Sequence, residues 1–416
     1  MSRRLLSLAV LGMFASAPAL AADPISITFW HYQTSNKDML VEQIDAFMAD
    51  NPDVQVVEQY KDNNTMAAEI QAAALAGRAP DVGQVLSRLT IGLVRNANPA
   101  PLDSGEDGGA YLENILPNFL EIGTYEGKPY LAPHSFGLPI VYINRDIFRE
   151  AGLDPDQPPA TWQDVREAAR TITENTGKIG FYVSTGGRDV APQQMMVNAG
   201  ADMLSPDFTR ATFATPDAIA SMQLWQDMVL EDKSMSTLTE RENASLFLGG
   251  QVGMMVQSVA TFQGAKRASE GVFDLGVAPY PRWGDKPQRL ANSGAGLMVY
   301  SQDEARRAAA LRFIAWMMQP EISNKWAVTS GYMPVAPGAE NDPIVTAYLA
   351  EEPRWEVAIS QMDALVPTAR WPGSRVVEIQ IVLENMVEAL KQGSGTAADL
   401  VPAAEAEITR LIAQGS

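Results

Sequence analysis

The stretch LPIVYINRDIFREAGLDPDQPPATWQD, residues 138–164, decides the fold class. Its opening residues are rich in β-branched and aromatic side chains and predict a strand that ends at Asn144. A short helix is expected over Asp146–Ala151, with Gly152 as its stop signal. Thr161 is typical of the N-cap of a second helix. A strand followed at once by helices indicates an α/β protein.

The residues before this stretch repeat the alternation. Three strands alternate with two helices, in the order Ile25–Trp30, Lys37–Asn51, Val54–Val57, Thr65–Gly77 and Asp81–Leu86. Strand, helix, strand, helix and strand at this spacing predict a parallel α/β unit.

The residues after it continue in the same way. Strands are expected over residues 179–184, 252–257, 275–279 and 296–300, and helices over residues 217–230, 240–248, 303–319 and 321–329. The segment after Pro337 is expected to be almost entirely helical. This many elements predict two α/β lobes rather than one.

The composition excludes several classes of function. A formal net charge of −19 over 416 residues argues against nucleic acid and anionic membrane surfaces as partners. The sequence has no cysteine, which excludes disulfides, thiolate metal sites and cysteine nucleophiles. Its two histidines, His31 and His134, are not spaced as metal ligands. We therefore expect no metal and no cofactor.

The first 22 residues predict a cleavable secretory signal. A positive start, Met1–Arg4, precedes the apolar run Leu5–Leu20 and the small residues Ala19–Ala22. The apolar run, about sixteen residues, is shorter than the roughly 20 that a membrane-spanning helix needs. Without a cysteine the protein is not a lipoprotein, so we expect a soluble protein in the periplasm. Export by the general secretory route or by the twin-arginine route stays open.

Several ordered motifs point to one family. They are the stretch 138–165, GRAPDV at Gly77–Val82, FLGGQVGMM at Phe247–Met255 and GYMPV at Gly331–Val335. Together they resemble the family 1 extracellular solute-binding proteins of carbohydrate ABC importers, over about residues 25–390. Within that family the sequence is most similar to the glycerol-3-phosphate-binding branch.

The resemblance implies a two-lobe periplasmic-binding-protein fold that is type II-like. Parallel-rich sheets flanked by helices, a hinge between the lobes and a helical C-terminal segment are expected. We place the N-terminal lobe at residues 23–132 plus about 282–335, and the C-terminal lobe at about 133–281 plus about 336–416. Ligands of open α/β sheets lie beyond the carboxyl ends of strands, so the site is expected in the cleft between the lobes.

The resemblance also implies a function. A periplasmic monomer would capture a sugar, glycoside or polyol, including phosphorylated or sulfonated forms. It would deliver this ligand to an inner-membrane ABC permease pair with a cytoplasmic ATPase. The alternative is a glycerol-3-phosphate or glycerophosphodiester-binding protein of such an importer. Against it, Asn64, Ser87 and Gly137 stand where that branch is expected to carry Tyr, Glu and Ser, and Gly186 lies near an expected Trp.

Sugar recognition needs planar polar groups for hydroxyls and aromatic faces for C–H patches. Such residues follow the predicted strands and turns, and we expect ligand contacts from His31, Tyr32, Gln33, Asn63, Asn64, Ser87, Arg88, Phe136, Gly187, Arg188, Ser258, Asn292, Ser293, Gly294, Tyr332, Arg370, Trp371 and Arg375. Direct contact is expected foremost from Asn64, Ser87, Asn292 and either Arg370 or Arg375. An arginine fork is the natural partner of an anionic ligand.

A secreted glycoside hydrolase is a remote alternative. That chemistry needs two positioned carboxylates that flank the bond, whereas the acids here lie mostly on helix faces and in the connection Asp103–Asp107. The motifs of serine hydrolases, zinc proteases and phosphate loops are missing from the sequence. We therefore expect no enzyme and no catalytic residue. Docking to a chemoreceptor, or adhesion, without transport is a further alternative.

Overall fold

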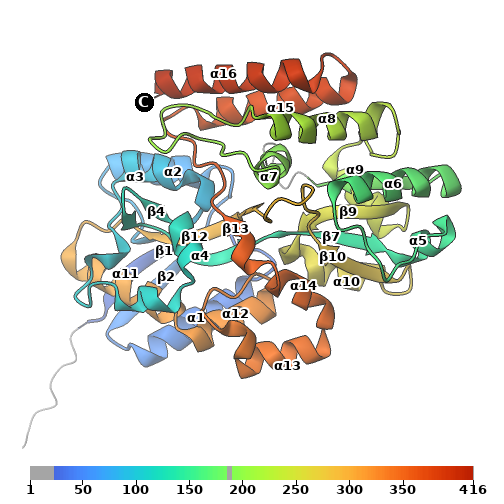
Figure 1. Ribbon diagram of the computed structural model, residues 1–416. Coiled ribbons are helices and arrows are strands. Elements are labelled where there is room, and N and C mark those ends of the chain that lie inside the picture. The colour runs from blue at the N-terminus through green and yellow to red at the C-terminus, as the bar shows by residue number, and fades with distance from the viewer. Residues whose placement is uncertain (1–22, 185–189, 416) are drawn as a thin grey trace, which may run out of the picture.

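The computed structural model describes residues 23–184 and 190–415. Its two large sheets are each flanked by helices, and they form two lobes that lie next to each other in Figure 1.

The first lobe contains a five-stranded sheet in the order β2-β1-β3-β12-β6. As expected, β1 (Ile25–His31) pairs in parallel with β2 (Val54–Tyr60) and with β3 (Val82–Leu86). β12 (Ser293–Val299) and β6 (Ala132–Gly137) extend the sheet in antiparallel pairing, so it is mixed. The helices of this lobe are α1 (Lys37–Asp50), α2 (Met66–Leu75), α3 (Thr90–Ala97), α11 (Glu304–Met317) and α12 (Pro320–Ser330).

The second lobe contains a four-stranded sheet in the order β10-β7-β9-β8. β7 (Pro139–Asn144) pairs antiparallel with β9 (Val252–Ser258) and with β10 (Leu275–Pro279). β8 (Ile179–Val183) runs parallel to β9. The helices of this lobe are α5 (Arg145–Ala151), α6 (Trp162–Thr176), α7 (Val190–Asn198), α8 (Pro216–Leu230), α9 (Glu240–Leu248) and α10 (Phe262–Ser269).

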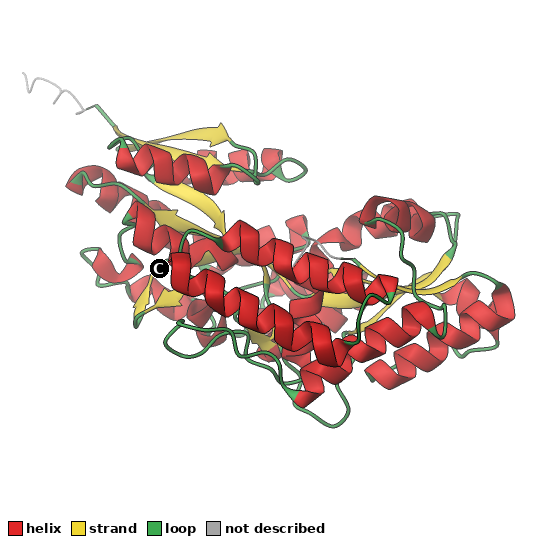
Figure 2. Cartoon of the chain, turned by 90° about the horizontal axis from the view of Figure 1, so that it is seen from above, coloured by secondary structure: helices red, strands yellow, loops and turns green. Residues whose placement is uncertain are grey.

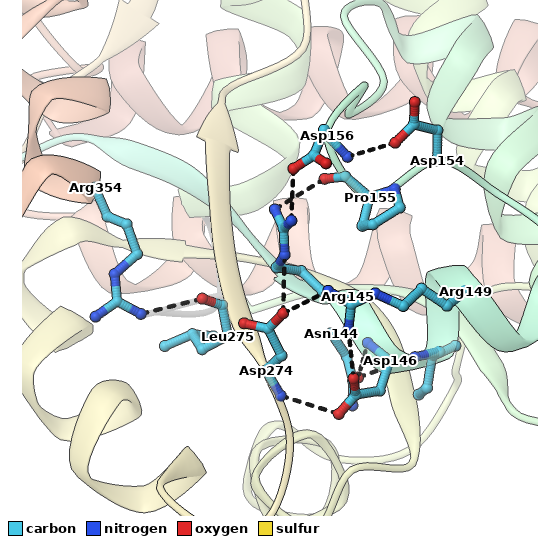
Figure 3. Close-up of polar contacts among 11 residues, drawn as sticks. Asn144, Arg145, Asp146, Arg149, Asp154, Pro155, Asp156, Asp274, Leu275 and Arg354 are labelled. Atoms are coloured by element: carbon cyan, nitrogen blue, oxygen red, sulfur yellow. Dashed lines mark hydrogen bonds and ion pairs between the residues drawn. The ribbon is translucent and has the colours of Figure 1, made fainter.

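The stretch 138–164 forms β7, α5 and the start of α6, and its polar residues fix the turns (Figure 3). The Asn144 side chain caps α5 by accepting two backbone N–H groups of the first turn. Arg145 donates to Asp274, just before β10, over 3.1 Å and also pairs with Asp156. These polar residues therefore hold the start of α5 to the loop that follows it and to the start of β10.

The chain passes from the first sheet to the second at Leu138, between β6 and β7. It returns between β10 and β12, and beside β12 the strand β11 (Leu290–Ala291) pairs in parallel with β13 (Leu365–Val366). The first change of sheet thus falls after β6 rather than directly after residue 132. The remaining lobe boundaries stay a prediction.

The C-terminal segment is helical and touches both lobes. α13 (Pro343–Glu351) packs on α12 of the first lobe, and α14 (Glu356–Ile359) packs on β10 of the second. α15 (Val376–Gln392) and α16 (Ala397–Gly415) lie side by side along α8, as the view from above shows (Figure 2). Short elements fill the connection before β6, namely α4 (Pro117–Ile122), β4 (Thr124–Tyr125) and β5 (Lys128–Pro129). In the part of the chain described, the helices are all too short or too polar to cross a membrane.

Candidate ligand-binding cleft

Strand ends from both lobes meet at a cavity of about 260 Å³, which we call the first chamber. The first lobe contributes Tyr32 after β1, and Ser87 and Arg88 after β3. The second lobe contributes Ser184 after β8 and Ser258 at the end of β9. The remaining lining residues are Asn63, Leu86, Pro139, Val190, Gln194, Val256, Gln257, Ala260, Asn292, Ser293, Gly294, Tyr332 and Thr368.

A second chamber of about 680 Å³ adjoins the first, and the two share Tyr32, Ala260 and Tyr332. Its other lining residues also come from both lobes: Gln33, Thr34, Ser35, Asn36, Met39, Thr261, Gln263, Gly264, Arg267, Thr329 and Ser330. A hollow of about 670 Å³ around Asp81 and Arg306 takes no described residue from the second lobe. The two chambers therefore form the cleft between the lobes.

The charge of this cleft contrasts with the acidic chain. Among the described lining residues, Arg88 of the first chamber and Arg267 of the second are the only charged side chains. The Nε of Arg88 is buried without a hydrogen-bond partner, and within residues 23–184 and 190–415 Arg88 pairs with no carboxylate. Behind the lining, the carboxylate of Glu240 accepts from the Ser184 hydroxyl over 2.6 Å. The cleft thus offers positive charge in a protein whose formal net charge is −19.

Tyr32 and Tyr332 give both chambers an aromatic boundary. Tyr332 stacks on Trp326, with 6.4 Å between the ring centroids and 13° between the ring planes. Burial raises the pKa of Tyr32 far above its ordinary value, with a further rise from Tyr332 and an opposing effect from Arg88. Burial also raises the pKa of Tyr332. Both phenols therefore stay neutral and can donate hydrogen bonds to a ligand.

Asn292 joins three segments in the first chamber. Its Nδ2 lies 2.8 Å from Ser87 Oγ, and its Oδ1 accepts the backbone N–H of Thr368 over 2.9 Å. Its own backbone N–H donates to the carbonyl of Val366. The side chain is buried and both ends of its amide are engaged within the protein. Asn292 is therefore placed to orient its neighbours.

Gln257 has a corresponding place in the second lobe. Its Oε1 accepts the backbone N–H of Ser258 over 2.8 Å, and its Nε2 donates to Ser184 Oγ over 2.5 Å. The Ser258 Oγ accepts the backbone N–H of Ala260 over 3.3 Å, just before α10. These bonds fix the orientation of the Ser184 and Ser258 hydroxyls on this side of the cleft.

A layer of buried polar side chains supports the cleft from the first lobe. Gln33 and Gln84 both donate to Ser135 Oγ over 3.2 Å. His31 is fully buried, and its Nε2 lies 2.8 Å from a carboxylate oxygen of Glu58. His31 thus belongs to the support of the cleft rather than to the lining of either chamber.

The structure brings half of the predicted ligand-contact residues together. Those that line the first chamber are Tyr32, Asn63, Ser87, Arg88, Ser258, Asn292, Ser293, Gly294 and Tyr332. Gln33 lines the second chamber. Their role in binding stays a prediction, but their common location supports it.

Other predicted residues lie away from both chambers. Asn64 is exposed in the turn before α2, and Phe136 is buried in the core against Phe119. The Arg370 guanidinium donates to backbone carbonyls near the end of α4, and Trp371 is fully buried. Arg375 pairs with Glu378 on α15. Among the arginines of the described chain, Arg88 therefore takes the place in the first chamber that we expected for Arg370 or Arg375.

Two predicted residues, Gly187 and Arg188, lie outside the described residues. Four polar lining residues of the first chamber were not among those predicted: Ser184, Gln194, Gln257 and Thr368. Ser184 directly follows β8, so the rule of strand ends could have found it. Gln194 lies on α7, which is not among the helices expected from the sequence. The described residues include no group of three or more potential metal ligands among His, Asp and Glu.

Comparison with known proteins now decides the family. The sequence pattern of the bacterial extracellular solute-binding protein family matches residues 42–352. The chain belongs to that family. Members bind a small solute and work with the permeases and the ATPase of an ABC importer. Membership of the family confirms the solute-binding function expected from the sequence, and the solved structures below share the expected two-lobe fold.

Individual relatives agree with the family. The protein is 25% identical over 393 residues to the sn-glycerol-3-phosphate-binding periplasmic protein UgpB of Escherichia coli K12, covering 89% of each chain. It is 26% identical over 402 residues to UgpB of Yersinia pseudotuberculosis, covering 92% of this chain and 90% of that one. These relatives are binding proteins and not enzymes.

Solved structures share the fold. The cyclic alpha-maltosyl-1,6-maltose binding protein of Arthrobacter globiformis matches with a TM-score of 0.84 at 23% identity, covering 94% of this chain and all of that one. UgpB of Mycobacterium tuberculosis, in complex with glycerophosphocholine, matches with a TM-score of 0.79 at 21% identity, covering 95% of this chain and 99% of that one.

Proposed function

We propose that this protein captures an anionic sugar, glycoside or polyol in the periplasm, with Arg88 as the anchor of the anionic group. The group would be a phosphate or a sulfonate, and the polyol or sugar part would contact the tyrosines and the hydroxyl and amide side chains. The protein would deliver this ligand unchanged to its ABC importer.

The position of Arg88 carries the proposal. It is the only charged side chain among the described residues of the first chamber. Its Nε is buried without a partner, which is costly unless a ligand atom completes the site. An arginine fork suits the oxygens of a phosphate or sulfonate. A neutral sugar would leave this charge without a counter-ion.

Relatives favour the same chemistry. The UgpB proteins of Escherichia coli and Yersinia are named for sn-glycerol 3-phosphate, which is an anionic polyol. Glycerol 3-phosphate or a glycerophosphodiester is therefore the second candidate for this protein. Ser87 and Gly137 speak for a different anionic ligand, because that branch is expected to carry Glu and Ser there.

The cellular setting is also part of the proposal. Cleavage of a signal peptide would release a soluble monomer that begins at Asp23. Mass spectrometry of protein from the periplasmic fraction should find that N-terminus.

The absence of catalysis is tested separately. Incubation with the tightest ligand should leave the ligand chemically unchanged by NMR, and multiple turnover would overturn the binding-protein role.

Matched pairs of ligands test the main point. Isothermal titration calorimetry would compare glycerol with glycerol 3-phosphate, glucose with glucose 6-phosphate, and methyl glucoside with its 6-sulfonate analogue. In the pair that fits, the anionic member should bind at least about 10-fold tighter, because a hydrogen bond to a charged group contributes more than a neutral one. Its affinity should fall as salt rises. Equal affinity for both members at every salt concentration would contradict the proposal.

A further inference from the structure

The amide of Asn292 can take only one orientation. A backbone N–H can only donate, so the atom that meets the Thr368 N–H at 2.9 Å must be the carbonyl oxygen of the side chain. The NH₂ group is then the one that meets Ser87 Oγ at 2.8 Å. Asn292 is therefore a donor to Ser87, and the reverse bond is excluded.

This orientation decides what the Ser87 hydroxyl can do. A serine hydroxyl has one hydrogen and two lone pairs. One lone pair of Ser87 Oγ takes the N–H of Asn292, so the hydroxyl hydrogen points elsewhere. No acceptor for that hydrogen exists among residues 23–184 and 190–415. The hydrogen is thus available to a solute in the first chamber, which Ser87 lines.

The second lobe presents hydrogens in the same manner. The backbone N–H of Ser258 donates to Gln257 Oε1, so the NH₂ group of Gln257 is the end that donates to Ser184. Only one of its two hydrogens is needed for that bond. Ser258 Oγ accepts from the Ala260 N–H, which leaves its hydroxyl hydrogen available. Ser87 and Ser258 thus each spend a lone pair on a donor of the protein and keep the hydroxyl hydrogen for the solute.

We propose that Asn292 is the positioning residue that makes this chamber selective for an oxyanion. By donating to Ser87, it makes the Ser87 hydroxyl a donor toward the solute, beside the Arg88 guanidinium. A phosphate or sulfonate has only acceptor oxygens in its ionised form and suits the donors of Ser87 and Arg88, whereas a sugar hydroxyl also needs an acceptor. The inference rests on the proposed function, in which the first chamber holds the anionic group.

The substitution Asn292→Asp reverses the direction of the hydrogen bond to Ser87 and keeps the shape of the side chain. An ionised aspartate can only accept, so it keeps the Thr368 N–H and takes the Ser87 hydroxyl hydrogen. Affinity for the tightest anionic ligand of the calorimetric series should fall by about 10- to 100-fold at pH 8. Affinity should recover as pH falls, because the protonated carboxyl again donates to Ser87. Burial near Ser87 raises the pKa of a carboxyl, which brings this recovery into an accessible range.

The effect of the new negative charge on affinity must be separated from the effect of the reversed hydrogen bond. A double-mutant cycle with Ser87→Ala does so, because without the hydroxyl only the charge of Asp at 292 acts. The loss caused by N292D should be at least about 3-fold smaller in the S87A protein than in the wild type. Asn63→Asp is the matched control. It adds a carboxylate to the same lining without a bond to Ser87, so its effect should be equal in both proteins.

Additive effects of S87A and N292D would overturn the role of Asn292 and leave the anionic ligand standing. Equal affinity of the wild type for neutral and anionic ligands would count against the proposed function instead. Neutron diffraction from deuterated crystals of the free protein tests the bond without any ligand. It should find two deuterons on Asn292 Nδ2 and the Ser87 deuteron directed away from Asn292. A Ser87 deuteron on the line to Asn292 would overturn the inference.

Discussion

His134 stacks on Trp326, with 4.5 Å between the ring centroids and 29° between the ring planes. Trp326 in turn stacks on Tyr332, which lines both chambers. The three rings connect the cleft with β6 and the interior of the first lobe. A change in the charge of His134 therefore acts on the support of the ligand-binding surface.

We expect His134 to make the protein less stable in mild acid. Burial, and to a lesser degree His31, lowers the pKa of His134 to about 3. An unfolded histidine titrates near 6.5, so between these values the unfolded state binds more protons than the folded state. The free energy of unfolding should be unaffected above pH 6.5. It should fall by up to about 1.4 kcal/mol per pH unit as pH drops through this window.

Urea unfolding at pH 7, 6, 5 and 4 measures this effect. His134→Gln should lower stability at pH 7, because Gln84 and Ser135 lose a partner. The decline of its stability with falling pH should be shallower than that of the wild type. Parallel declines would show that His134 titrates alike in both states.

Arg88→Gln should weaken binding of the anionic ligand by about 10- to 150-fold, because a charged hydrogen bond contributes up to about 3 kcal/mol. The dependence of affinity on salt should disappear with the charge. Arg375→Gln is the matched control, since Arg375 pairs with Glu378 outside the cleft. It should leave calorimetric affinity unchanged within about twofold. A larger loss from R375Q than from R88Q would mean that the anchor has been misassigned.

Gly137→Ser should disturb the first chamber. A Cβ atom at Gly137 would lie 2.6 Å from Ser258 Oγ, so the Ser258 side chain must move. We expect about 10-fold weaker binding from the loss of its hydrogen bond to the ligand. Gly92→Ser is the control, because a Cβ there meets only the Gly373 carbonyl at 3.8 Å. Unchanged affinity in G137S would remove Ser258 from the set of ligand contacts.

Ligand binding should bring the lobes together. Two lobes with a cleft between them close by hinge motion when the ligand contacts both sides. Small-angle X-ray scattering should give a smaller radius of gyration with saturating ligand than without it. R88Q at the same ligand concentration should stay near the value of the free protein. A constant radius in the saturated wild type would indicate a rigid site.

Sequence reasoning succeeded where the signal is local. Periodicity and capping residues located most helices and strands, because each depends on neighbours within a few positions. The rule that ligands lie beyond strand ends led to Ser87, Arg88 and Ser258, since each follows its strand directly.

Sequence reasoning failed where contacts between residues far apart in the chain determine the structure. β6 reads APHSFG and lacks a strand pattern, yet it forms a buried strand against β12, and distant Gln33 and Gln84 donate to its Ser135 hydroxyl. Arg370 and Arg375 are alike in sequence context. Only the folded chain shows that Arg370 turns to the carbonyls that end α4 and that Arg375 turns to α15.

The place of β12 between β3 and β6 in the first sheet affects the order in which the chain can fold. β3 and β6 are complete in sequence by residue 137, but both pair with β12, which begins only at Ser293. Until that strand has been synthesised, β6 has no partner through which to join β2, β1 and β3. Pairing across such long separations is slow, because loop closure precedes any gain from the contacts. The first lobe therefore completes its sheet only late in the synthesis of the chain.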